Sequence, residues 1–163
     1  MPPIKVLDDG TKKWYDDDGE RHREDGPAIE HADGAREWFW HGEWHRIGGP
    51  AAENNNSKLW YVHGELHRED GPAMEYTNGR EEWWVNGEWH RVGGPARVLE
   101  DGTKEWYENH ELHRLDGPAI EHADGSKEWY LNGRSVSEEE VRKTYSLERL
   151  TDMKLDAPEK VTF

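Results

Sequence analysis

Cysteine is absent from this sequence of 163 residues, which excludes a disulfide framework and any metal site built on thiolates. The absence fits a reducing compartment, and we expect a cytoplasmic protein. Long apolar runs are lacking too, so the sequence predicts no membrane-spanning segment and no contact with a membrane. We expect no signal peptide before the first repeated segment.

Positive charge is scarce, since 21 Lys and Arg stand against 36 Asp and Glu and give a net charge of −15. This balance argues against nucleic acid as a direct partner. Only 33% of residues are hydrophobic, and the mean hydropathy of −1.21 is typical of disordered chains. Ten Trp and six Tyr indicate a folded protein instead, because large rings bury much area per residue.

The sequence is an internal repeat of about 23 residues. The segment "PAIEHADG" occurs at 27–34 and again at 118–125, and five His-Arg pairs begin at residues 22, 45, 67, 90 and 113. Gly-Pro-Ala follows each pair, and a Trp followed by an aromatic residue keeps the same interval. Six units open near Pro3, Pro27, Pro50, Pro72, Pro95 and Pro118.

Each unit has the composition of a β-hairpin. Asp-Gly or Asn-Gly pairs, as at Asp33-Gly34, favour tight turns, and a second turn such as His41-Gly42 follows the aromatic pair. Single-layer repeats need only contacts between neighbours. We therefore predict an all-β repeat: an elongated antiparallel meander of six hairpin units with about two strands each and about twelve in all, over residues 1–134.

The repeat stops after residue 134, and residues 135–163 are predicted to form a helix and a tail. Ser137 and Glu140 have the spacing of a capping box, and acidic residues open the segment. We predict a helix near 138–150 that covers the last sheet edge, with Val141 and Tyr145 on one face. Residues 151–163 are expected to be an ordered or semi-ordered tail.

The 23-residue interval, the "ADG" turns and the "W-x-N-G-x-x-H" element resemble MORN repeats, which build elongated sheets from hairpins. Arg and Gly-Pro-Ala after the His depart from that pattern and are closer to the variant "W-Y-x-N-G-x-x-H-R-x-D-G-P-A" repeats of phage and giant-virus proteins. The resemblance covers roughly residues 3–134. It implies a hairpin fold, a viral origin, a location in the cytoplasm of the host cell and a role in interactions.

No residue pattern indicates catalysis or a cofactor, so we expect a protein that is not an enzyme. Equivalent His residues of successive units should lie about 9–10 Å apart, too far to share a metal ion. Each His is expected to pack beside its own turn. Each Arg after a His is expected to pair with a repeated acid (Glu30, Glu75 or Glu121) or with a turn Asp. The alternative is that the arginines, here Arg46, Arg68 and Arg91, bind a ligand.

The aromatic pairs allow two interpretations. Neighbouring strand residues point to opposite faces, so one face would bury the first Trp of each pair and the other would display the second ring. That exposed row would be a binding surface, to which Trp40 also belongs. The row consists of Tyr15, Phe39, Tyr61, Trp84, Tyr107 and Tyr130. The alternative is that coiling of the sheet, or long Arg and Lys side chains, cover both faces.

The units also alternate. Trp44 and Trp89 stand before the His only where Gly48 and Gly93 replace the turn Asp, so the copied unit is a pair of hairpins. We hypothesise that both indoles lie over these glycines and form two anchors for a partner, about 19 Å apart. The alternative is that they only staple their turns.

Three functions follow from these patterns. The first is a protein-binding repeat module, in a viral setting an inhibitor of a host or bacterial defence protein. The second is an acidic mimic of DNA. The third is a sponge for a phosphorylated nucleotide signal, held by Arg and aromatic side chains. The sequence gives no oligomeric state.

Overall fold

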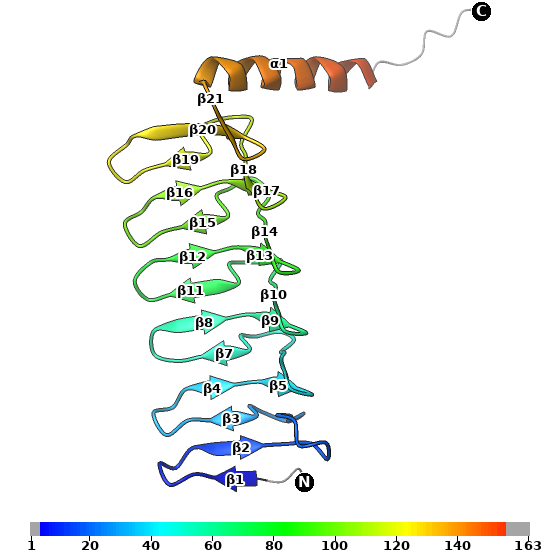
Figure 1. Ribbon diagram of the computed structural model, residues 1–163, viewed down its shortest axis with the longest axis vertical. Helices are drawn as coiled ribbons and strands as arrows, with labels where there is room; N and C mark the ends of the chain where they lie inside the picture. Colours follow the sequence, from blue (N-terminus) through cyan, green and yellow to red (C-terminus); the bar gives the residue numbers. More distant parts are fainter. Residues whose placement is uncertain (1–3, 156–163) are drawn as a thin grey trace, which may run out of the picture.

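Six hairpins stack in single file and form one antiparallel sheet in the computed structural model, which describes residues 4–155 (Figure 1). Every strand pairs with its neighbour in sequence order among the strands of this sheet, which confirms the predicted meander. The thirteen strands are β1 (Ile4–Val6), β2 (Lys12–Trp14), β3 (Ile29–Glu30), β4 (Arg36–Glu37), β7 (Ala52–Glu53), β8 (Ser57–Leu59), β11 (Met74–Tyr76), β12 (Glu81–Glu82), β15 (Arg97–Val98), β16 (Lys104–Glu105), β19 (Ile120–Glu121), β20 (Lys127–Leu131) and β21 (Arg134–Val136).

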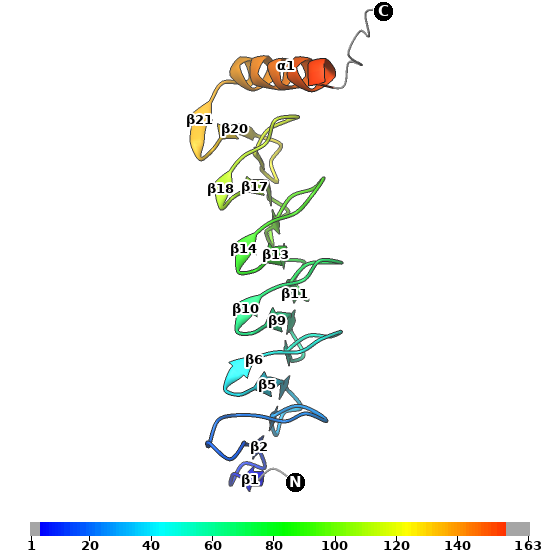
Figure 2. The same cartoon turned by 90° about the vertical axis from the view of Figure 1, so that its right-hand side faces the viewer.

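Four units carry a second, smaller hairpin outside this sheet. These hairpins pair β5 (Phe39–Trp40) with β6 (Glu43–Trp44), β9 (Tyr61–Val62) with β10 (Glu65–Leu66), β13 (Trp84–Val85) with β14 (Glu88–Trp89), and β17 (Tyr107–Glu108) with β18 (Glu111–Leu112). They project to one side of the main sheet, and the loops that return from them project to the other (Figure 2).

The described chain therefore has 21 strands, and the expectation of about twelve was wrong. In the four units that carry a small hairpin, the first Trp of the pair divides one long strand into two. Trp38, for example, lies between β4 and β5, and its N–H donates to the carbonyl of Ala51 in the next unit at 2.7 Å. This bond joins neighbouring units at the point where the chain leaves the main sheet.

Two kinds of turn connect the strands. At Asp33-Gly34 only the glycine has a positive φ (92°), and Asp33 accepts a hydrogen bond from the N–H of Ala35 at 3.0 Å. The N–H of Gly34 also donates to the carbonyl of His31, which makes a three-residue loop closed by a left-handed glycine. The second turn is tighter, because both His41 (45°) and its following glycine have positive φ.

The core is a column of alanines. The Ala of every Gly-Pro-Ala is at most 1% exposed, and these residues are Ala28, Ala51, Ala73, Ala96 and Ala119. Each accepts the N–H of the preceding unit's Trp on its carbonyl, at 2.7–2.9 Å. A small side chain suits this position because successive units approach closely there. A larger cluster joins Ala28 to Ile29 and Phe39, with Trp44 packed against it.

The helix α1 (Glu138–Leu155) lies across the end of the stack, next to β20 (Figure 1). The Ser137 hydroxyl accepts the N–H of Glu140 at 3.2 Å, as the capping pattern predicts, while the Glu140 side chain pairs with Arg134. Val141 is buried, but Tyr145 is 38% exposed. The helix runs five residues beyond the predicted end, so residues 151–155 are not a tail, and residues 156–163 lie outside the described part.

Candidate binding surface

One feature recurs in five units: the Arg of each His-Arg pair lies flat on the Trp eight or nine positions before it. The guanidinium carbon is 3.6–4.1 Å from the ring centre in every case, which is stacking distance for a cation on an aromatic face. The pairs are Arg23 on Trp14, Arg46 on Trp38, Arg68 on Trp60, Arg91 on Trp83 and Arg114 on Trp106. Arginine therefore covers five of the six rings in the first row of Trp.

The glycine of each Gly-Pro pair closes the other side of the guanidinium. A Cβ on Gly49 would lie 2.9 Å from Cζ of Arg46, and one on Gly94 would lie 2.9 Å from Cζ of Arg91. No side chain fits there unless the arginine moves. An NH1–H of each Arg also donates to the proline carbonyl, 3.0 Å away for Arg46. The guanidinium is thus fixed from three sides before anything binds to it.

In the first, third and fifth loops the arginine is neutralised by the chain itself. Nε of Arg68 donates to Asp70 at 2.8 Å and NH1 donates to Glu75 at 2.7 Å. Arg23 and Arg114 make the same two contacts, with Asp25 and Glu30 and with Asp116 and Glu121 respectively. These contacts confirm the predicted ion pairs for those three units, including Arg68.

The second and fourth loops lack the turn Asp, and only the second unit keeps the Glu, as Glu53, which pairs with another arginine. Gly48 and Gly93 replace the Asp, Val98 replaces the Glu of the fourth loop, and Glu53 pairs with Arg36 at 3.6 Å. Within residues 4–155, Arg46 and Arg91 form no ion pair. Their hydrogen bonds in that part of the chain go to the carbonyls of the following prolines.

The same two loops expose apolar side chains. Ile47 is 76% exposed and Val92 is 87% exposed, and each stands directly after the arginine that has no acid. Beside Arg46 lies an open groove of about 590 Å³, whose lining includes Trp60, His67 and Asp70. An equivalent groove of about 340 Å³ lies beside Arg91. The loops that carry these residues point away from the small hairpins (Figure 2).

The row of second aromatic rings is not displayed to solvent. Phe39 is 5% exposed, and Tyr61, Trp84 and Tyr107 are half-buried. They belong to the first strands of the small hairpins and pack on rings of these hairpins, as where the ring centres of Tyr61 and Trp44 are 4.8 Å apart. The structure therefore fits the alternative in which both faces are covered. Of the predicted surface, Trp40 alone is exposed (40%), beside His22.

Trp44 and Trp89 do not lie over the loop glycines, so that part of the hypothesis was wrong. No atom lies within 4 Å of where a Cβ on Gly48 or Gly93 would stand. Both indoles are half-buried and pack on the small hairpins and on the ring of the following unit. Their ring contacts therefore connect neighbouring units.

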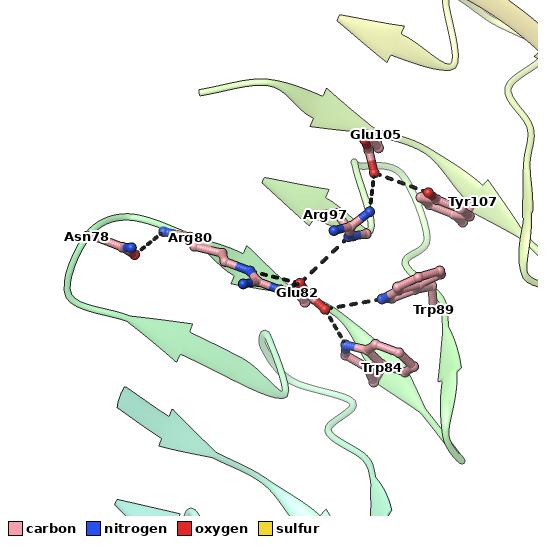
Figure 3. Close-up of polar contacts among 8 residues, drawn as sticks. All are labelled: Asn78, Arg80, Glu82, Trp84, Trp89, Arg97, Glu105 and Tyr107. Atoms are coloured by element: carbon pink, nitrogen blue, oxygen red, sulfur yellow. Dashed lines mark hydrogen bonds and ion pairs between the residues drawn. The ribbon is translucent and has the colours of Figure 1, made fainter. Parts of the chain in front are cut away.

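A buried carboxylate accounts for the fixed position of Trp89 (Figure 3). Glu82 on β12 is 2% exposed and accepts hydrogen bonds from the indoles of Trp84 (3.0 Å) and Trp89 (3.3 Å) and from the Arg80 guanidinium (2.5 Å). Nε of Arg97 lies 3.6 Å from the same carboxylate. Burial raises the pKa of Glu82, but these donors and charges outweigh it and leave the pKa lowered.

In four of the five His-Arg pairs (His22, His45, His67 and His113) the His faces the second turn of the next unit, not its own turn as expected. Nδ1 of His45 accepts the N–H of His63 at 3.1 Å, and Nδ1 of His67 accepts the N–H of Asn86 at 3.2 Å. A neutral ring that accepts on Nδ1 carries its proton on Nε2. Burial and the charge of His63 lower the pKa of His45, which favours this neutral form.

Between the first and second units, ligand atoms of Asp16, His22 and His41 lie within 4.8 Å of one another, an arrangement the spacing argument overlooked because it considered only equivalent residues. These groups already bond to each other. His22 Nδ1 accepts the N–H of His41, and His41 Nδ1 is 2.8 Å from Asp16.

The described helix is not long and apolar enough to cross a membrane. Comparisons of the sequence with protein-family models and with curated proteins give no match.

Proposed function

We propose that this chain is a non-enzymatic protein-binding module that uses its row of His-Arg loops as the contact surface. The observation that carries the proposal is the exposure of Ile47 (76%) and Val92 (87%) at equivalent positions two units apart. Exposed apolar side chains that recur on one edge of a repeat protein indicate a partner that contacts equivalent positions of different units. The acidic loops between them would set the charge of that partner.

The resemblance to phage and giant-virus repeats supports a finer proposal, in which the partner is a protein of the infected bacterium or host and binding inhibits it. Binding would inhibit the partner sterically, because a straight stack of hairpins places several contacts along one line. A partner that touches the second and fourth loops spans about 19 Å, which is four strand spacings.

The experiment is a quantitative capture of host proteins by the full chain, compared with the variant Ile47→Ser/Val92→Ser. We expect the variant to lose the captured proteins, because both apolar contacts are removed while buried residues are untouched. Val6→Ser, which changes a side chain 60% exposed on β1, is the matched control and should retain them.

Salt separates this function from the two others suggested by the sequence. Capture that persists at high salt and depends on Ile47 and Val92 supports the proposal, because burial of apolar surface is weakly screened. Loss at moderate salt with no effect of the double variant would favour mimicry of DNA. Equal capture by wild type and double variant contradicts the loop surface.

A further inference from the structure

We propose that Arg46 and Arg91 are preformed binding positions for acidic side chains of the partner, an inference that rests on the protein-binding role proposed above. Each would accept one Asp or Glu of an extended segment, with an apolar residue of that segment on Ile47 or Val92. The partner would thus be acidic where it meets the second and fourth loops.

The occupied loops show what such a site holds. Around Arg68, a carboxylate of Asp70 meets Nε at 2.8 Å and a carboxylate of Glu75 meets NH1 at 2.7 Å. Around Arg91, the same stacking on Trp83 and the same bond to Pro95 are present, but Gly93 and Val98 stand where the two acids would be. The carboxylates on Arg68 therefore show how an acidic side chain would meet Arg91.

Arg46 and Arg91 are held in place by the chain, with no acid of their own beside them. Arginine stays charged at any physiological pH and offers several donors in a fixed plane that matches a carboxylate. Stacking on Trp38 and contact with Gly49 hold Arg46 in the orientation of its occupied counterparts. Because this side chain is already ordered, binding loses little of its conformational entropy.

The surroundings favour a carboxylate over a phosphate. Glu69 and Asp70 line the groove beside Arg46, and Glu108 and Asp116 line the groove beside Arg91. A phosphate dianion would meet more repulsion from these acids than a single carboxylate would. The adjacent exposed Ile47 and Val92 add apolar area that a side chain of a peptide can cover, whereas a free inorganic anion cannot.

The test follows the Nε–H signals of the arginines by nuclear magnetic resonance in the full chain at constant ionic strength. The probes are acetyl-Leu-Asp-Leu-amide, its matched control acetyl-Leu-Asn-Leu-amide, and inorganic phosphate. We expect the Asp peptide to shift the signals of Arg46 and Arg91 in a saturable manner. Those of Arg23, Arg68 and Arg114 should stay in place, because their own acids occupy them.

Three outcomes would overturn the inference: no saturable shift, equal shifts at all five arginines, or an equal effect of the Asn peptide. Tighter saturation by phosphate than by the Asp peptide would also overturn it and assign the positions to a phosphorylated ligand. If the arginines fail this test while Ile47→Ser/Val92→Ser still abolishes capture, only this inference falls and the protein-binding role stands.

Loop exchange tests the same idea without removing an arginine. Ile47→Glu/Gly48→Asp gives the second loop the sequence of the third, which this chain already folds, and should abolish the response of Arg46 while Arg91 still responds. The reverse exchange, Glu69→Val/Asp70→Gly/Glu75→Val, should make Arg68 respond. A response of Arg46 that survives the first exchange, or an Arg68 that stays silent after the second, contradicts the proposal.

Discussion

The guanidinium carbon of Arg91 lies 3.6 Å from the ring centre of Trp83, and the space for a Cβ on Gly94 is filled by the same guanidinium. One arrangement thus links three residues that are separate in the sequence. It explains why Trp, His-Arg and Gly-Pro recur together: each guanidinium needs an aromatic face on one side and no side chain on the other.

Gly94→Ala should destabilise the fold by about 1–3 kcal/mol, the usual range for an added methyl in a packed site. The new Cβ would stand 2.9 Å from Cζ of Arg91 and would force it off Trp83. Urea unfolding followed by circular dichroism measures the change. Val92→Ala, two residues away and 87% exposed in the wild type, should stay within about 0.5 kcal/mol. Equal stability of the Gly94 variant and the wild type would show that the guanidinium is not held there.

Glu82→Gln should lower the free energy of unfolding by about 2–4 kcal/mol, because Arg80 loses its charged partner and Arg97 keeps only one of its two, Glu105. The neighbouring Glu81→Gln is the control, since Glu81 pairs with no cation in the described chain, and its effect should stay within about 0.5 kcal/mol. Chemical unfolding at neutral pH measures both. If the two variants lose similar amounts of unfolding free energy, Glu82 does not hold the fourth and fifth units together.

The free energy of unfolding should decrease as the pH falls below 6.5, the ordinary pKa of histidine, because the pKa of His45 is lowered in the folded state. Above pH 6.5 the ring is neutral in both states and its contribution is complete. As the pH falls, the unfolded chain takes up a proton at His45 that the folded chain does not, so the unfolded state is favoured. Below the lowered pKa the folded chain is protonated too, and His45 loses its bond to the N–H of His63. Unfolding curves from pH 7.5 to 5.5 test this. In His45→Asn the slope over this range should be smaller, and an unchanged slope would place the titration elsewhere.

Deletion of residues 50–71, one whole unit, should leave a folded and shorter protein, since contacts are mainly between neighbours. Deletion of residues 50–94, two units, should keep more of the stability of each remaining contact. It preserves the order in which Trp44 meets a tyrosine of the following unit, as it meets Tyr61 in the wild type. Circular dichroism and thermal melting compare the two. If the one-unit deletion is unfolded, the units do not fold through contacts with their neighbours alone. If the two-unit deletion is less stable than the one-unit deletion, the alternation of units in pairs does not matter for stability.

Dialysis against a chelator should leave the melting temperature unchanged. The Nδ1 atoms of His22 and His41 are already bonded, to the backbone and to Asp16, so the contact between the first and second units is made by the chain itself. Calorimetry before and after dialysis checks this. A fall of several degrees that added Zn²⁺ reverses would show that Asp16, His22 and His41 hold an ion.

The interval of the repeat determined the fold class, because a hairpin that recurs every 23 residues can bury its apolar residues only against its neighbours. The ion pairs of Arg23, Arg68 and Arg114 also followed from the sequence, since their acids recur at fixed distances along the chain. The alternation of Gly48 and Gly93 with Asp was visible there as well.

Which rings would be exposed was decided by the tertiary structure. Strand alternation places Trp38 and Phe39 on opposite faces, but it does not show that β5 leaves the main sheet, that Arg46 covers Trp38, or that Phe39 becomes 5% exposed. The position of Trp44 was decided in the same way, by Glu37 and by a ring of the next unit. These contacts join residues of different strands, and their direction depends on where the small hairpins turn. Local sequence specifies each turn, whereas the angle between two hairpins arises only when the units stack.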